Sequence, residues 1–161
     1  MSELEVNIDI SLQLLEVMDD AKVVFSAFVS TALNGAGEKN GSECTPRGTH
    51  IIRAKIGAGC VNNTVFVGRR PSGETYTESL KRQQPDRDWI LTRILWLSGC
   101  EPGVNRLGSV DTMRRYIYIH GCPDDIEMGV PGSHGCIRMT NKDVVKLFEL
   151  LPVYTVVNIR E

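Results

Sequence analysis

The sequence predicts a mainly β domain, a β-rich α+β fold, with one helix near the C-terminus. Three features predict this fold: short runs in which apolar and polar residues alternate, Gly- and Pro-bearing stretches between them, and a single segment with helical spacing. The 161 residues are too few for two separate hydrophobic cores, so the domain spans 1–161. The composition, 42% apolar and 24% charged, is typical of a folded globular domain.

The first third of the chain predicts a meander of strands. Apolar residues alternate with polar ones over Val6–Ile10, Leu12–Val17 and Lys22–Val29. The turn-prone Met18–Ala21 segment, which contains two aspartates, predicts a hairpin between the last two of these strands. Asn34–Gly48 is polar and rich in glycine, which predicts a surface loop that borders a cleft.

The middle of the chain predicts three further strands. Thr49–Lys55 and Val65–Gly68 have strand character, whereas Pro71–Arg87 is polar, shows no clear period and predicts a loop. Trp89–Leu97 is apolar at nearly every position. That pattern favours a strand buried on both faces, with a short helix as the alternative.

The segment after this strand predicts a loop, a short helical turn and a strand that ends at a histidine. Ser98–Ser109 reads as a loop, and Ser109–Arg115 as a brief helical turn. Tyr116–His120 then alternates as a strand, which ends on its histidine.

The C-terminal segment predicts the helix. Thr140 and Asp143 have the spacing of an N-terminal capping box, and Pro152 stops the helix. Val153–Ile159 follows as a closing strand. The apolar stripe that would dock the helix consists of Val144, Leu147, Phe148 and Leu151.

The charge and the cysteine content indicate which binding partners and which cellular location to expect. The 18 basic and 20 acidic side chains give a net charge of -2, which disfavours nucleic acid and anionic membranes as partners. No apolar run is long enough to span a bilayer, and the acidic start Met1–Glu5 is unlike a secretory leader. The five cysteines form an odd set without regular spacing, which indicates reduced thiols. We therefore expect a cytoplasmic protein, or a periplasmic one if a leader has been removed.

The chemistry concentrates in two short segments around His120 and Cys136. A cysteine becomes a strong nucleophile when a neighbouring imidazole accepts its proton, and both His120 and His134 are candidates for that role. Residues two apart in an extended segment share a face, so His134 and Cys136 can project together, with Gly135 allowing close approach of a substrate. Backbone N–H groups near Cys136 can hold an oxyanion, and the planar guanidinium of Arg138 can bind a carboxylate.

Two alternatives stand beside this interpretation. The first is that the cysteine is a small buried hydrophobe and the histidines are structural. The second is a zinc site built from His120, Cys122, His134 and Cys136, although only one residue separates the members of each pair and structural zinc sites usually have two to four. The sequence lacks the glycine patterns of dinucleotide and phosphate sites, and we expect no metal and no cofactor.

These motifs resemble a known family, the YkuD-type L,D-transpeptidase catalytic domain. The resemblance rests on His120-Gly121 followed by the run Ser133 to Met139, which reads Ser-His-Gly-Cys-Ile-Arg-Met. Thr45-Pro46-Arg47-Gly48 resembles the Thr-Pro-x-Gly turn of the family, and Arg115 to Ile119 resembles its approach to the first histidine. The resemblance implies a YkuD-like β-sandwich or barrel whose C-terminal helix packs near the active-site cleft.

The resemblance also implies the role of each residue. Cys136 would be the nucleophile and His120 the general base, with the Gly121 carbonyl orienting the imidazole. His134 and Gly135, with Ser133, would shape the oxyanion pocket, and Arg138 would receive a substrate carboxylate.

The implied reaction is an attack on the bond between the L-centre of a diamino acid, commonly meso-diaminopimelate, and the terminal D-alanine of a peptidoglycan tetrapeptide. Water as acceptor gives an L,D-carboxypeptidase, and an amine gives a transpeptidase that forms 3-3 cross-links or exchanges D-amino acids. Because we expect a cytoplasmic protein, we predict an L,D-carboxypeptidase of muropeptide recycling. The transpeptidase is the first alternative, and a non-catalytic muropeptide-binding domain is the second.

One position departs from the family pattern. The residue after His-Gly is more often a small hydroxyl residue, and here it is Cys122. A second thiol near the nucleophile predicts a reversible disulfide with Cys136, which would switch activity off on oxidation. The alternative is a passive substitution.

Overall fold

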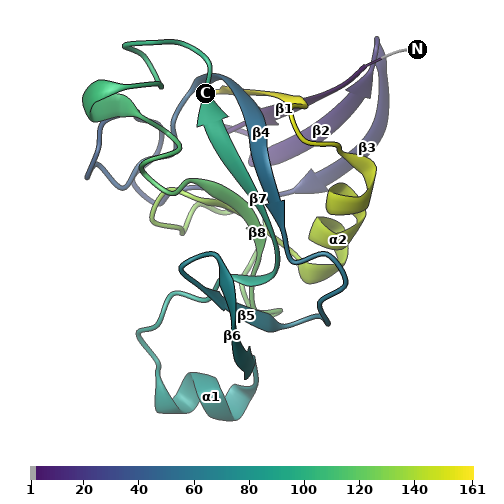
Figure 1. The fold of residues 1–161 in the computed structure, drawn as a ribbon, viewed down its shortest axis with the longest axis vertical. Coiled ribbons are helices and arrows are strands. Elements are labelled where there is room, and N and C mark those ends of the chain that lie inside the picture. The colour runs from purple at the N-terminus through teal and green to yellow at the C-terminus, as the bar shows by residue number, and fades with distance from the viewer. Residues whose placement is uncertain (1–2) are drawn as a thin grey trace.

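The computed structural model describes residues 3–161, and it contains one open mixed β-sheet with two α-helices (Figure 1). The predicted mainly β class is therefore confirmed, together with the C-terminal helix. Over these residues, neither helix has the length and apolar character required to cross a bilayer.

The strands in chain order are β1 (Leu4–Asp9), β2 (Leu14–Asp19), β3 (Lys22–Phe28), β4 (Gly48–Ile56), β5 (Thr64–Val67), β6 (Arg70–Thr75), β7 (Leu91–Gly99), β8 (Tyr118–Gly121), β9 (Ile137–Met139) and β10 (Val156–Arg160). The helices are α1 (Glu78–Gln83) and α2 (Asn141–Leu150), and a 3₁₀ turn covers Gly108–Val110.

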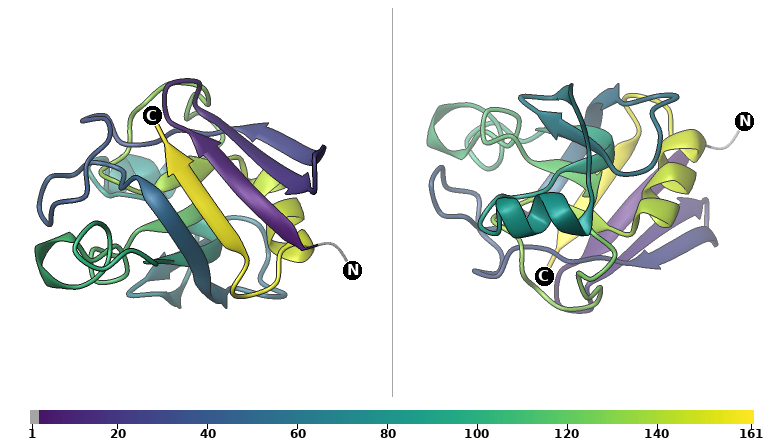
Figure 2. Two further views of the ribbon diagram at one scale, coloured as in Figure 1. Left: turned by 90° about the horizontal axis from the view of Figure 1, so that it is seen from above. Right: turned by 90° about the horizontal axis from the view of Figure 1, so that it is seen from below.

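The sheet follows the order β3-β2-β1-β10-β4-β7-β5-β6, and β8 pairs with β7 and β9. The β1–β10 and β8–β9 pairs are parallel, and the remaining pairs are antiparallel. The last strand thus lies between β1 and β4, side by side with both (Figure 2, left). The predicted hairpin turns at Asp20, whose φ of 53° suits a tight turn between the paired Asp19 and Lys22.

The main core lies inside the curve of this sheet. Alternate residues of β1, β2 and β4 point inward, as in Val6, Val17 and Ile52, each fully buried. They meet the inner faces of β7, β8 and β9, and α2 packs against β7 and β8. Strand β7 is buried on both faces, because Leu95 belongs to this core and Ile94 to a smaller cluster behind it. The strand prediction for this segment is confirmed, and its helical alternative is wrong.

Helix α2 begins and ends where the sequence predicts. The Thr140 hydroxyl accepts the backbone N–H of Asp143 at 3.1 Å, which caps the first turn. Val144 and Leu147 are fully buried against the sheet, and the helix ends before Pro152. The position of α2 matters for the site, since only the capping residue Thr140 separates its first residue from β9.

The predicted loop Pro71–Arg87 is wrong in part, because this segment contains most of β6 and all of α1. No α1 residue is buried, so the short helix has no apolar stripe that a sequence pattern could reveal. Local contacts hold it instead: Thr77 caps it, an edge-on ring contact of 5.1 Å joins Tyr76 to Trp89, and Arg87 pairs with Glu74 at 2.7 Å. The β5–β6–α1 unit extends from the lower end of the molecule in Figure 1.

Three boundaries before the site also differ from expectation. Strand β7 continues to Gly99, into the predicted loop, and the helical turn is only the three residues Gly108–Val110. Strand β8 starts at Tyr118 rather than Tyr116, because Tyr116 has a φ of 57°, which lies outside the extended region of regular strand backbone.

Candidate active site

The parallel pairing of β8 with β9 brings the two sequence segments together. Ile119 lies opposite Ile137, and His120 lies opposite Arg138. Successive side chains of a strand point to opposite faces, so the two isoleucines enter the core while His120 and Arg138 face the other way. Cys136, one residue before β9, lies on the same face as His120.

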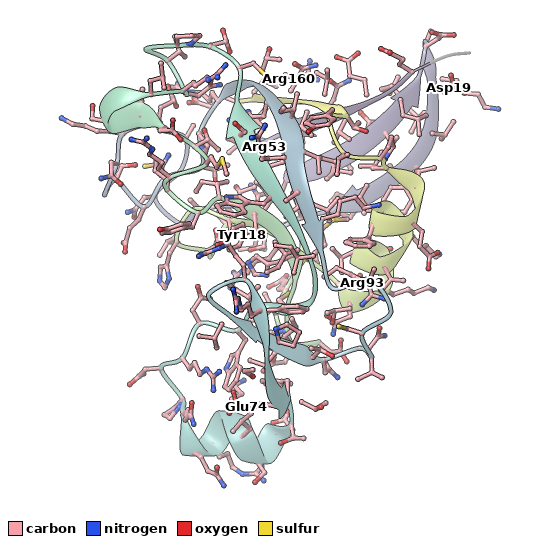
Figure 3. All side chains as sticks on the ribbon, viewed as in Figure 1. Asp19, Arg53, Glu74, Arg93, Tyr118 and Arg160 are labelled. Carbon is pink, nitrogen blue, oxygen red and sulfur yellow. The ribbon has the colours of Figure 1, made fainter. Side chains whose placement is uncertain are left out.

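That face opens into a cavity of about 260 Å³. Six of the residues that line it are Asp88, His120, Ser133, His134, Cys136 and Arg138. Tyr118, another lining residue, lies between the upper sheet and the lower β5–β6–α1 unit (Figure 3). The lining residues come from the loop before β7, from the segment that leads into β8, and from the turn and strand around Cys136.

His120 is buried and hydrogen-bonded through one ring nitrogen. Its Nδ1 lies 2.7 Å from the Gly121 carbonyl oxygen, which can only accept. Nδ1 therefore carries the hydrogen, and in the neutral ring Nε2 keeps a lone pair. Burial lowers the pKa of His120, so the imidazole is neutral at neutral pH. The residue thus has the charge state of a proton acceptor.

Cys136 is partly exposed, and its sulfur contacts backbone groups. Sγ donates to the Tyr116 carbonyl and accepts the Tyr118 N–H, each at 3.3 Å, and within residues 3–161 these are its hydrogen-bond partners. Burial raises the pKa of the Cys136 thiol to about 12, against a smaller opposite effect of the Tyr118 N–H. The resting nucleophile is therefore a neutral thiol, not a thiolate paired with imidazolium.

The turn that presents Cys136 depends on glycine and serine. Gly135 has a φ of 135°, and a Cβ there would lie 3.0 Å from the Ile117 side chain. The Gly135 N–H donates to the Ser133 hydroxyl at 3.2 Å, and that hydroxyl donates to the Cys136 carbonyl at 2.6 Å. Both residues therefore shape the turn, and an oxyanion would compete with Ser133 for the Gly135 N–H.

His134 lies at the rim of the cavity. Its side chain is 69% exposed, and its Nδ1 is 3.9 Å from a carboxylate oxygen of Asp88. His134 and Cys136 line the same cavity, as their spacing suggests, but His134 faces solvent whereas His120 is enclosed. Of the two candidate imidazoles, His120 is therefore the one that the fold holds in a fixed tautomer.

Arg138 brings a positive charge to the cavity that no protein carboxylate balances. Its Nη2 donates to the Ser30 hydroxyl at 2.9 Å, and its Nε has no hydrogen-bond partner. The guanidinium passes over Gly132, where a Cβ would lie 2.5 Å from Nη2. Among residues 3–161, no Asp or Glu oxygen lies within 4.0 Å of this guanidinium. A fixed, unpaired guanidinium is suited to a carboxylate ligand.

Cys122 and Cys136 are both free thiols in this structure, and the strand pairing separates their backbone positions. The pairing places Tyr118 level with Cys136, and Cys122, the residue after β8, is four residues further along the chain. At about 3.3 Å per residue their Cα atoms are about 13 Å apart, beyond the limit of about 7 Å for a disulfide. Cys122 is buried, donates to the Met139 carbonyl at 3.2 Å, and burial raises its pKa to about 12. The same separation divides the four residues of the alternative zinc set.

The sequence did not single out three residues that take part in this site. Asp88 lines the cavity from the loop before β7, and Arg115 lines it while donating to the Cys44 carbonyl at 2.6 Å. Thr45 is fully buried and donates to the Gly135 carbonyl at 2.8 Å. Arg115 and Thr45 thereby tie the 34–48 loop to the cysteine turn. Both lie in segments that carry the family resemblance, which was the only sequence signal for them.

Comparison with known proteins identifies the family and the fold. The family described as the L,D-transpeptidase catalytic domain, YkuD, matches residues 4–159. A curated relative, the probable L,D-transpeptidase YbiS of Escherichia coli strain K12, is 32% identical over 124 residues. That alignment covers 68% of this chain and 38% of YbiS, so the chain spans well under half of its relative.

Two solved structures share the fold. An L,D-transpeptidase of Xylanimonas cellulosilytica superposes with a TM-score of 0.57 at 20% identity, over 99% of this chain and 61% of the other. L,D-transpeptidase 3 of Mycobacterium tuberculosis, in complex with a faropenem-derived adduct, gives a TM-score of 0.57 at 15% identity, over 99% and 61%.

Proposed function

This chain belongs to the YkuD family of L,D-transpeptidase catalytic domains, and on that premise we propose that it is a cysteine-dependent L,D-carboxypeptidase. It releases the terminal D-alanine from peptidoglycan tetrapeptides through a thioacyl intermediate on Cys136. The bond that it cuts joins the L-centre of a diamino acid, commonly meso-diaminopimelate, to that D-alanine.

The observation that carries the proposal is a neutral imidazole and a neutral thiol on one face of β8 and β9. The His120 Nδ1–H bond to Gly121 leaves Nε2 as the proton acceptor. Because burial raises the pKa of Cys136 to about 12, the sulfur needs a base at the moment of attack. His120 supplies that base without a preformed ion pair.

The reaction then runs in two halves. His120 Nε2 takes the thiol proton as Cys136 Sγ attacks the carbonyl carbon of the scissile bond, and the thiol hydrogen leaves the Tyr116 carbonyl to make this transfer. The resulting imidazolium gives the proton to the leaving amine, so D-alanine departs and a thioester remains. A water molecule, deprotonated by His120, attacks the thioester, and the proton returns to the sulfur as the tripeptide is released.

Arg138 binds a carboxylate of the substrate in this proposal. Its guanidinium faces the cavity without a protein carboxylate, and a substrate carboxylate would provide the missing charge partner. In the same proposal, the turn of Ser133, His134 and Gly135 forms the oxyanion pocket, and the Gly135 N–H, now donated to the Ser133 hydroxyl, is a donor for it.

Water is the acceptor in this proposal because the sequence predicts a cytoplasmic protein, which would meet soluble muropeptides and not the wall. The second candidate, a transpeptidase, is favoured by the 32% identity to a probable L,D-transpeptidase.

The deciding experiment incubates purified protein with a disaccharide tetrapeptide and analyses the products by mass spectrometry. We expect free D-alanine and tripeptide in equal amounts, even with a second tetrapeptide or a free D-amino acid in excess. Cross-linked or exchanged product in place of tripeptide would instead identify a transpeptidase. Cys136→Ala abolishes turnover, while the matched control Cys100→Ala, a partly buried thiol at the end of β7, retains it. Substrate binding with no turnover by either variant or the wild type would mean a binding domain.

The cellular location is the remaining part of the proposal. Hydrolysis suits a cytoplasmic enzyme that trims soluble muropeptides returning from the wall, whereas cross-linking needs access to the wall itself. Fractionation of cells that produce the native protein tests this directly. Recovery in the periplasm would contradict the recycling role.

A further inference from the structure

Strand β7 contains a strained residue, Thr92, in a bulge that faces the His120–Gly121 step of β8. Leu91 pairs with Gly121 and Ile94 pairs with His120, so Thr92 and Arg93 are extra residues in a bulge between them. Thr92 has a φ of 76°, a region that β-branched residues rarely adopt. Such strain persists only where surrounding contacts enforce it, and it is commonest at functional sites. Strands β7 and β8 run side by side in Figure 1.

Three side chains from separate elements hold this bulge in a closed polar triangle. The Thr92 hydroxyl donates to Asn141 Oδ1 at 2.6 Å, and Asn141 Nδ2 donates to Asn63 Oδ1 at 2.8 Å. The Asn63 backbone N–H then donates to the Thr92 hydroxyl at 3.0 Å. Thr92 and Asn141 are both buried, so each bond that is lost would leave a polar group without a partner.

The triangle lies against Gly121. A Cβ on Gly121 would overlap Asn141 Oδ1 and would lie 3.2 Å from the Thr92 Cβ. Glycine is therefore required at this position, yet glycine has no side chain to restrain its own peptide. The Gly121 carbonyl is the group that fixes the tautomer of His120. The triangle thus packs against the residue whose carbonyl holds His120, in addition to the sheet pairing of Gly121 with Leu91 and Met139.

We infer that Thr92, Asn141 and Asn63 form a positioning device that fixes the tautomer and orientation of His120 through the Gly121 peptide. None of the three touches the reacting atoms, so their role is positioning and not catalysis. The inference rests on the proposed function, in which His120 is the general base. In this interpretation, the strained backbone of Thr92 is maintained because it places the hydroxyl that helps to hold His120 in position.

The test compares Thr92→Val with Thr92→Ser. Valine keeps the shape of threonine and removes the hydroxyl, whereas serine keeps the hydroxyl. The ¹⁵N shifts of the histidine ring nitrogens report the tautomer of His120, and steady-state kinetics of D-alanine release separate kcat from KM. The matched control is Thr155→Val, which removes another buried hydroxyl bond, 2.7 Å to the Pro152 carbonyl, in the turn before β10.

We expect Thr92→Val to populate both neutral tautomers of His120 and to lower kcat by about 10- to 100-fold, with KM changed less than about twofold. Thr92→Ser keeps the single Nδ1–H tautomer and most of the rate. Thr155→Val lowers the melting temperature without changing the tautomer. A folded Thr92→Val protein whose His120 keeps one tautomer would overturn the inference.

If Thr92→Val does not fold, Thr92→Gly replaces it, because glycine adopts the positive φ without strain. It also lacks the hydroxyl, so the same mixture of tautomers is expected, and a single Nδ1–H tautomer would again overturn the inference. The NMR comparison needs no substrate. If wild-type protein releases no D-alanine, the proposed function fails while the tautomer still decides the role of the triangle.

Discussion

The protonation state of Cys136 gives the sharpest prediction. Burial raises the pKa of this thiol to about 12, and the neutral His120 provides no positive charge to lower it. A cysteine that rests as a thiolate beside imidazolium would react rapidly with alkylating agents at neutral pH. We therefore predict slow alkylation of Cys136 in the folded protein.

The expected size of the effect follows from two opposing factors. At pH 7.5 a thiol with a pKa of about 12 is about 3,000-fold less ionised than one with an ordinary pKa of about 8.5. The logarithm of the thiolate's rate constant rises with thiol pKa with a slope of about 0.4–0.5, so each thiolate reacts about 40-fold faster when the pKa rises from about 8.5 to about 12. The net prediction is alkylation about 100-fold slower than for the same cysteine in unfolded protein.

The assay is iodoacetamide labelling across pH 6–10, read for each cysteine-containing peptide by mass spectrometry. The same peptides in urea supply the reference rate. We expect the rate at Cys136 to keep rising up to pH 10, and His120→Ala to change it little at pH 7.5. A plateau reached near pH 7, lost in His120→Ala, would demonstrate a preformed ion pair and refute the reasoning.

Three further predictions concern other positions. Gly121→Ala places a methyl group against Asn141 Oδ1. It should lower the free energy of unfolding, measured in urea, by about 1–3 kcal/mol and should also reduce kcat. Unchanged stability would show that the backbone moves aside. Burial lowers the pKa of His50 to about 4, below the unfolded value of about 6.5. The free energy of unfolding is therefore highest above pH 6.5 and falls by about 3 kcal/mol as the pH drops toward 4. His50→Gln should flatten this pH dependence of stability, as measured by urea titrations. Mild peroxide should yield no peptide pair linking Cys122 to Cys136, because their backbone positions are too far apart, and detection of that pair would contradict the β8–β9 register.

Local patterns were enough to predict most of the fold. Alternation located the N-terminal meander, the apolar run located β7, and the capping spacing at Thr140 located α2. The pattern failed for α1, since none of its residues is fully buried and Leu80 alone packs against the small apolar cluster beside it. It failed again at Tyr116, where a positive φ delays the start of β8.

The sequence by itself determined which residue types are available for chemistry, because the Ser-His-Gly-Cys run and the upstream His-Gly are contiguous motifs whose composition carries the signal. Only the tertiary structure decided how those groups are used. The β8–β9 register selects His120 as the enclosed imidazole, leaves His134 at the rim and separates Cys122 from Cys136. The physical reason is that pairing register, burial and the bulge at Thr92 depend on strands distant in the chain. These features set distances and pKa values that no local pattern contains.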